Sequence, residues 1–189
     1  LLNLKKIILT ASGGPFFGKK YSTLDNVSFK QASEHPMWKM GYKNSIDSAT
    51  MSNKCLELIE AHYLFDVPYK NLDIIIHPES KIHSIIESKN HIYNMIGFKN
   101  DMLIPIYHFL NQKFNYELID DKFSLYKNHN FNFKKVQYNQ YPIFKLFKQL
   151  DKSNPSNIIK FNVANEYAVN LFKNNTIKYT DIYKIIVKI

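Results

Sequence analysis

Residues 47–65 carry the strongest helical pattern in the sequence, and this segment constrains the fold more than any other feature. Polar residues at its start can cap a first turn, and good helix formers fill its middle. At about 100° per residue, Asn53, Lys54 and Glu57 fall on one polar face, and a largely apolar stripe begins beside them. The segment therefore predicts a long helix that packs its apolar side on a core and carries a polar cluster.

Two interpretations of this polar cluster are open on spacing alone. In the first, it is a solvated helix face on which Lys54 and Glu57 form an i, i+3 ion pair worth about 0.2–0.5 kcal/mol. In the second, it is a binding site, because the free N–H groups and positive potential of a helix N-terminus favour a phosphate. Ser48 could add a hydroxyl there, and Glu57 could hold a divalent metal beside a bound phosphosugar.

Short apolar runs around this helix predict strands. The first, at residues 6–10, ends in the glycine-rich turn of residues 11–15. Three more strands are expected at residues 72–77, 82–88 and 92–97, and a hairpin turn at 89–91 joins the last two. Short helices are expected at 24–33 and 102–110, with a loop at 34–44.

The chain changes character after residue 111. Residues 112–139 are polar, Asn-rich and aperiodic, which is typical of a linker, and helical spacing returns at 142–150, 157–172 and 180–189. We therefore expect an α/β fold class. An α/β domain at 1–111, with a small, mostly antiparallel or mixed sheet and flanking helices, precedes a linker at 112–139 and the start of an α-helical bundle domain at 140–189.

Charge and cysteine content narrow the classes of function. The net charge is +9, yet every basic residue is Lys. A dedicated nucleic-acid-binding protein uses Arg for bidentate contacts, so this charge favours a phosphorylated ligand more than a nucleic acid. No apolar run approaches the ~20 residues of a membrane-spanning helix. Cys55 is the only cysteine, which excludes a disulfide framework within the chain and indicates a reducing compartment.

Several blocks of sequence share their order and separations with one known family. They are ILTASGGPF at 8–16, HPMWKMGYKNSIDSAT at 35–50, IDSATMSNKCLELIEAHYLF at 46–65, IIIHPESKIHS at 74–84, NDMLIPI at 100–106 and, more weakly, FNVANEYAV at 161–169. These blocks closely resemble the 1-deoxy-D-xylulose 5-phosphate reductoisomerase family. The resemblance is strong over residues 6–110, poor through the expected linker and moderate beyond it.

The resemblance implies an oxidoreductase and isomerase of isoprenoid precursor biosynthesis. Enzymes of this family convert 1-deoxy-D-xylulose 5-phosphate to 2-C-methyl-D-erythritol 4-phosphate with NADPH and Mg²⁺ or Mn²⁺. The implied partner is thus a phosphorylated sugar, with no nucleic acid and no membrane, in a homodimer of the bacterial cytoplasm or of a plastid or apicoplast. The sequence has no GxGxxG fingerprint. We therefore expect the N-terminal NADPH-binding domain, and further metal ligands, outside this chain, and expect the chain alone to be inactive.

The same resemblance implies roles for individual residues. Substrate contacts fall to Ser12, His35, Ser48, Asn53, Lys54 and Glu57. Among them, Glu57, Lys54 and His35 are the expected catalytic residues, and Glu57 is also the expected metal ligand. Cofactor contacts fall to Gly41, Met40 and Met102, and Trp38 is the expected lid. Without the resemblance, Ser12 could simply serve a glycine turn and Trp38 could be a core aromatic residue.

Departures from the family pattern surround these residues. Ser52 stands in place of Met, Cys55 in place of Gly, Phe17 and Leu103 in place of Arg, and Asn100 in place of Pro. None of these changes removes an expected ligand. His77 and His83 have no common metal-ligand spacing and are expected to be structural. Two other functions are the alternatives: a decayed homologue that binds a partner, and, less favoured, a Lys-rich nucleic-acid-binding module.

Overall fold

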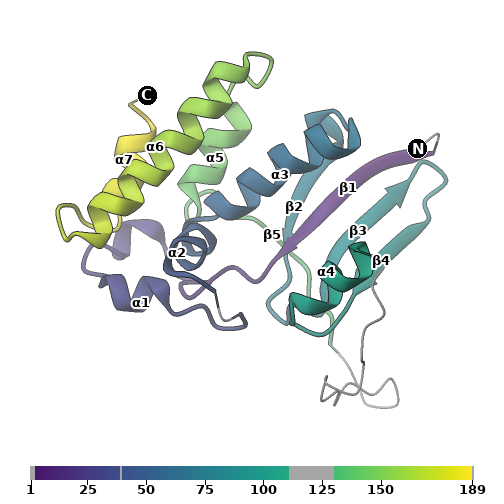
Figure 1. The fold of residues 1–189 in the computed structure, drawn as a ribbon, viewed down its shortest axis with the longest axis horizontal. Coiled ribbons are helices and arrows are strands. Elements are labelled where there is room, and N and C mark those ends of the chain that lie inside the picture. The colour runs from purple at the N-terminus through teal and green to yellow at the C-terminus, as the bar shows by residue number, and fades with distance from the viewer. Residues whose placement is uncertain (1–2, 39, 111–129, 189) are drawn as a thin grey trace.

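A five-stranded mixed sheet forms the α/β part of the chain (Figure 1). The computed structural model describes residues 3–38, 40–110 and 130–188. The strands are β1 (Leu4–Ala11), β2 (Leu72–Ile76), β3 (Ile82–Ser88), β4 (Tyr93–Gly97) and β5 (Lys134–Lys135), in the order β4-β3-β1-β2-β5. β1 is parallel to β2, and the other pairs are antiparallel. The expected mixed sheet and β3–β4 hairpin are confirmed.

Helices connect the parallel strands and build the second half of the chain. Between β1 and β2 lie η1 (Tyr21–Thr23), α1 (Phe29–Ser33), α2 (Tyr42–Thr50), α3 (Ser52–Phe65) and η2 (Tyr69–Asn71). After β4 come α4 (Leu103–Phe109), α5 (Pro142–Gln149), α6 (Pro155–Lys173) and α7 (Asp181–Ile186). The helices expected near 102–110, 142–150, 157–172 and 180–189 are therefore confirmed within a few residues. None of the helices in the described ranges combines the length and apolarity that crossing a bilayer requires.

The single helix expected at residues 47–65 is wrong. The backbone of Met51 adopts a left-handed conformation, with φ at 70°, so that α2 ends at Thr50 and α3 begins at Ser52. A hydrogen bond from the hydroxyl of Thr50 to that of Ser52, 2.9 Å long, bridges the break. The Met51 side chain is 1% exposed, so burial offsets the cost of its backbone conformation. The loop expected at 34–44 also ends earlier, at Gly41, where α2 starts.

The described part of the expected linker, residues 130–139, contains the strand β5. β5 pairs with β2, where Ile75 faces Lys135 and Ile76 faces Lys134. Residues 111–129 lie outside the described residues, so the division into domains stays a prediction.

α3 lies at the centre of the molecule. Figure 1 shows it between the sheet and the helices α5 and α6, and it contacts all of them. Its buried side chains include Cys55, Leu58 and Ala61. One cluster of buried residues runs from β1 and β2 through α3 to α5, α6 and α7. The helical part of the chain, which comprises α5, α6 and α7, therefore shares a core with the sheet, and α3 packs against both.

Candidate functional site

A glycine turn brings the end of β1 against α2. A Cβ atom added to Gly14 would lie 2.9 Å from the Cα of Ala49 and 3.0 Å from the carbonyl oxygen of Ser48. Gly14 also has a φ of +70°, which disfavours other residues. The turn and α2 therefore touch with no room for a side chain, and this contact sets the turn that carries Ser12 against the part of α2 that carries Ser48.

Hydrogen bonds around Ser12 and His35 fix the direction of their protons. The backbone N–H groups of Met37 and Trp38 donate to Nδ1 of His35, at 3.2 and 2.9 Å. Nδ1 must carry a lone pair, so the neutral ring has its proton on Nε2 and donates to Oγ of Ser12, 3.1 Å away. The Gly14 N–H donates to the same oxygen over 3.1 Å. The Ser12 hydroxyl thus accepts twice, and its own proton can donate to a ligand.

The first turn of α3 gathers the polar cluster predicted from helical spacing. Nδ2 of Asn53 donates to Oε1 of Glu57 over 2.6 Å, and Nζ of Lys54 donates to Oε2 over 2.7 Å. The side chains of Lys54 and Glu57 are 22% and 31% exposed, so the pair is partly shielded from water. The predicted common face is therefore confirmed, and Glu57 is its centre.

Electrostatics link this cluster to the histidine loop. Burial lowers the pKa of His35 and the positive charge of Lys54 lowers it further, which fits the neutral ring. Lys54 therefore lies within electrostatic reach of the Ser12–His35 pair. The described contacts bring together two groups of expected site residues: Ser12 with His35, and Asn53 with Lys54 and Glu57.

His83 is a site neighbour that sequence reasoning missed. Its ring lies 5.8 Å from that of Trp38 in an edge-to-face contact and stacks on Phe98 at 3.8 Å. Its Nε2 lies 3.2 Å from Oδ1 of Asn100. Burial lowers its pKa, the Asn100 hydrogen bond opposes this, and the charge of Lys54 adds to the lowering. No spacing pattern relates a β3 residue to the loop before α2, so only the fold reveals this contact.

His77 has the structural role that was expected. It is fully buried, and its Nδ1 lies 3.0 Å from the carbonyl oxygen of Asn132. The Lys81 N–H donates to its Nε2 over 3.1 Å. His77 therefore ties the β2–β3 turn to the chain before β5.

The remaining expected site residues lie on two other segments. Ser48 is half-buried on α2, directly behind the glycine turn. Met40 and exposed Gly41 immediately precede α2. Met102 is 55% exposed at the start of α4, on a separate element from the other two expected cofactor contacts.

A metal ion would find one carboxylate in this cluster. Within residues 3–38, 40–110 and 130–188, no group of three or more His, Cys, Asp or Glu side chains is arranged to hold a metal. Glu57 lies beside neutral and cationic donors, so it can supply one oxygen anchor. Since Mg²⁺ is usually bound through one or two carboxylates plus substrate oxygens and water, the described residues fit part of such a site.

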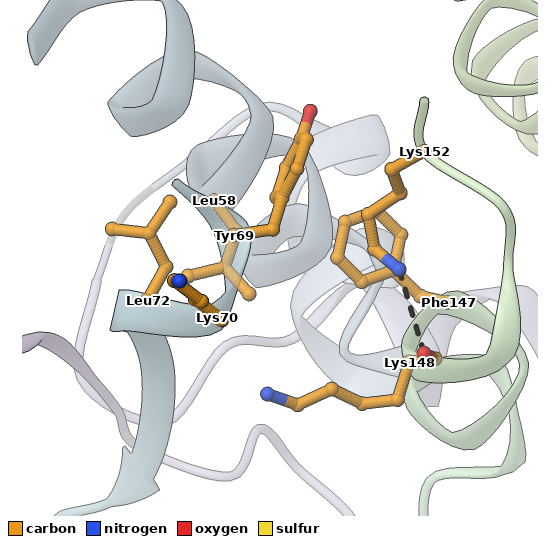
Figure 2. Close-up of a pocket in the computed structure, with 7 residues that line it drawn as sticks. All are labelled: Leu58, Tyr69, Lys70, Leu72, Phe147, Lys148 and Lys152. Atoms are coloured by element: carbon orange, nitrogen blue, oxygen red, sulfur yellow. Dashed lines mark hydrogen bonds between the residues drawn. The ribbon is translucent and has the colours of Figure 1, made fainter. Parts of the chain in front are cut away.

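A cavity of about 210 Å³ lies beside Leu58 of α3 (Figure 2). It is lined by Leu58, Tyr69, Lys70, Leu72, Phe147, Lys148 and Lys152. Lys152 donates to the carbonyl oxygens of Lys148 and Leu150 at the end of α5, and Lys148 pairs with Asp73 at 3.1 Å. Two of its lysines therefore already have acceptors, and none of the expected site residues reaches it.

Comparisons with known proteins agree on one family. Residues 2–65 match the 1-deoxy-D-xylulose 5-phosphate reductoisomerase C-terminal domain, and residues 99–189 match the DXP reductoisomerase C-terminal domain. The 1-deoxy-D-xylulose 5-phosphate reductoisomerase of Clostridium tetani is 44% identical over 190 residues, covering 97% of this chain and 48% of the relative. That of a Sulfurihydrogenibium species is 42% identical, covering 98% and 49%.

Solved structures give the same result. A crystal structure of DOX-P reductoisomerase in complex with NADPH, fosmidomycin and magnesium has a TM-score of 0.90 at 37% identity, covering 98% of this chain and 45% of that one. The enzyme from Zymomonas mobilis in complex with NADPH has a TM-score of 0.85 at 35% identity, covering 98% and 48%. The chain spans about half the length of the curated relatives it matches.

Proposed function

The chain belongs to the 1-deoxy-D-xylulose 5-phosphate reductoisomerase family, and from this premise we propose that it forms the substrate- and metal-binding part of such an enzyme. The full-length protein would convert 1-deoxy-D-xylulose 5-phosphate to 2-C-methyl-D-erythritol 4-phosphate with NADPH and Mg²⁺ or Mn²⁺. One observation carries the proposal: the Glu57 carboxylate is held between Asn53 and Lys54 in the first two turns of α3.

The phosphate of the substrate would meet donors from three elements. Ser12 has a hydroxyl proton free to donate, and Ser48 adds a second hydroxyl beside the turn. Once Glu57 gives its oxygens to a metal, Nδ2 of Asn53 and Nζ of Lys54 become available for phosphate and hydroxyl oxygens. Lys54 supplies the charge and the neutral groups fix orientation, as in other phosphate sites. Binding thus exchanges internal hydrogen bonds for bonds to the ligand.

Glu57 would hold the metal together with ligands from outside the described residues. An ion held there would supply Lewis acidity toward the carbonyl and hydroxyl oxygens of the substrate. Lys54 shields the carboxylate until then. Two similar structures are complexes with magnesium, which is consistent with a metal site in the full-length protein.

His35 and Trp38 would close the site. His35 orients the Ser12 hydroxyl through its Nε2 proton and can contact the substrate. Trp38 already packs on His83 of β3, so the loop before α2 reaches across to the sheet. Excluding water there strengthens every electrostatic contact inside the site.

NADPH would be bound mainly by a domain outside this chain. We propose that Gly41, Met40 and Met102 contact the cofactor near its nicotinamide. The division into a catalytic domain at 1–111, a linker at 112–139 and a partial helical domain at 140–189 belongs to the same proposal. Similar structures hold NADPH, which is consistent with an N-terminal NADPH-binding domain in the full-length protein.

A homodimer is the proposed assembly, with β4 at its interface. β4 ends the sheet, all five of its residues are exposed, and Tyr93, Met95 and Ile96 are about half-exposed apolar side chains. An uncovered apolar edge strand is a template for pairing with another chain.

The named relatives are bacterial, which favours the bacterial cytoplasm over a plastid.

A turnover assay tests the function. The full-length protein should oxidise NADPH only when 1-deoxy-D-xylulose 5-phosphate and Mg²⁺ or Mn²⁺ are both present. Lys54→Met should raise KM for the sugar phosphate at least about tenfold, because it removes the positive charge from a phosphate contact. Lys160→Met, which removes an exposed lysine of α6, is the control and should leave KM unchanged. Absence of NADPH oxidation by the full-length protein would refute the proposal.

A further inference from the structure

The helical part of the chain holds both elements that carry the proposed phosphate-binding serines. One contact joins Tyr141 to the glycine turn after Ser12, and another joins Asn165 to α2 beside Ser48. Both contacts are buried and link residues more than a hundred positions apart. None of these helical residues was assigned a role on sequence grounds.

Tyr141 holds the glycine turn through a hydrogen bond. Its hydroxyl donates to the carbonyl oxygen of Gly13 over 2.8 Å, and the Tyr141 side chain is 2% exposed. Burial raises the pKa of Tyr141, so the phenol keeps its proton and remains a donor at physiological pH. Tyr141 is also the N-cap residue of α5, which anchors it to a packed helix. The turn that orients Ser12 is therefore tied to α5.

Asn165 grips α2. Its Nδ2 donates to Oδ1 of Asp47 over 2.8 Å, while Lys43 donates to Oδ2 over 2.6 Å. Asn165 and Asp47 are almost fully buried, and Asp47 directly precedes Ser48. Burial raises the pKa of Asp47, whereas the Lys43 and Asn165 hydrogen bonds oppose that rise and favour the carboxylate. The hydrogen bond from α6 therefore reaches Asp47, the residue next to Ser48, which is a proposed phosphate-binding residue.

The Asn165 amide has a feature that packing alone does not explain. Its Oδ1 is buried without a hydrogen-bond partner among the described residues. An unpaired buried acceptor is unfavourable, and an apolar side chain of similar size would avoid it. The hydrogen bond from Nδ2 to Asp47 is therefore the contact that an apolar side chain of similar size could not provide.

The glycine turn and α2, the two elements held by these hydrogen bonds, meet at one close contact. The Cα of Gly14 lies so near Ser48 and Ala49 that no side chain fits between them. A shift of either element changes the separation of Ser12 and Ser48. We infer that Tyr141 and Asn165 are positioning residues, which hold these serines at the spacing that a phosphate group requires. This inference rests on the proposed function of the two serines.

Two substitutions of similar size in the full-length protein test it. Tyr141→Phe removes only the hydroxyl, and Asn165→Leu removes only the amide. Each should raise both KM for 1-deoxy-D-xylulose 5-phosphate and the inhibition constant of inorganic phosphate about tenfold, with kcat changed less than about twofold. A residue that only stabilised the fold would lower Tm and leave the inhibition constant of phosphate unchanged.

Tyr179→Phe is the matched control. Tyr179 is a fully buried tyrosine of the same helical part, and its hydroxyl has no partner among the described residues. Both kinetic constants should stay at their wild-type values in this variant. Constants within about twofold of wild type in folded Tyr141→Phe and Asn165→Leu would overturn the inference. A wild-type protein that neither turns over the sugar phosphate nor is inhibited by phosphate would instead refute the proposed function itself.

Discussion

At the scale of single residues, proton direction decides what the site can bind. His35 accepts two backbone hydrogen bonds at Nδ1 and donates from Nε2, which leaves the Ser12 hydroxyl as an outward donor. A protonated His35 would point a second N–H at those two backbone donors. The same neutral state suits His83, whose Nδ1 faces the Phe98 N–H and whose Nε2 faces Asn100.

These two histidines predict a loss of stability in mild acid. Their pKa values are lowered in the folded protein, so the unfolded chain binds more protons as pH falls below about 6.5. The free energy of unfolding should therefore fall from that pH down to the folded pKa values. His35→Asn keeps an acceptor for the two N–H groups without a titrating ring, and urea unfolding between about pH 5 and 7.5 should show a shallower decline.

His83→Asn provides the comparison for the second ring. Its effect on the pH dependence should have the same sign, and the double variant should show the smallest decline of all. An identical decline in wild type and the double variant would show that neither ring is held neutral by the fold.

At the scale of elements, the glycine turn and the break at Met51 build the site together. The break lets α3 start at Ser52, so Asn53 and Lys54 lie in its first turn, while Ser48 stays on α2 against the turn. Periodicity could not detect the break, because Met is a good helix former that rarely adopts a positive φ. The common face of Asn53, Lys54 and Glu57 was predictable, because all three lie within one regular helix.

A pair of alanine substitutions tests the contact between the turn and α2. Gly14 and Gly18 both have positive φ, at +70° and +86°, but a Cβ meets the backbone of α2 only at Gly14. Gly18→Ala should cost about 1 kcal/mol, from backbone strain alone. Gly14→Ala should cost more, by about 1–3 kcal/mol, and should weaken binding of the sugar phosphate. Equal losses in urea unfolding would mean that the turn has room to move.

At the scale of the whole molecule, one core joins parts that the sequence divides. Short apolar runs predicted β2, β3 and β4 closely, since local pattern determines a strand. Other features depend on partners far away in the chain, which no local pattern contains. They are β5, the Trp38–His83 contact and the hydrogen bonds of Tyr141 and Asn165. The assignment of roles within the site depends on family resemblance, because spacing alone favours a solvated helix face.

The exposed edge of the sheet predicts the assembly state. Ile96→Lys places a charge on β4 and should shift the protein from dimer toward monomer, as measured by light scattering after size exclusion. Ile159→Lys is the control, since Ile159 is 63% exposed on α6 and Ile96 is 48% exposed. Dimers that persist in Ile96→Lys, or that dissociate equally in both variants, would exclude β4 as the interface.

The most direct test of the central claim is Mg²⁺-dependent turnover by Glu57→Gln in the full-length protein. The amide keeps the size of the side chain, its oxygen can still accept from Lys54, and Asn53 can turn its own amide to accept from the new NH2 group, so unfolding should resemble that of wild type. Turnover should fall at least about 100-fold and should not recover at higher Mg²⁺ concentration, because an anionic ligand has been lost. Full Mg²⁺-dependent activity in a folded Glu57→Gln protein would contradict the account.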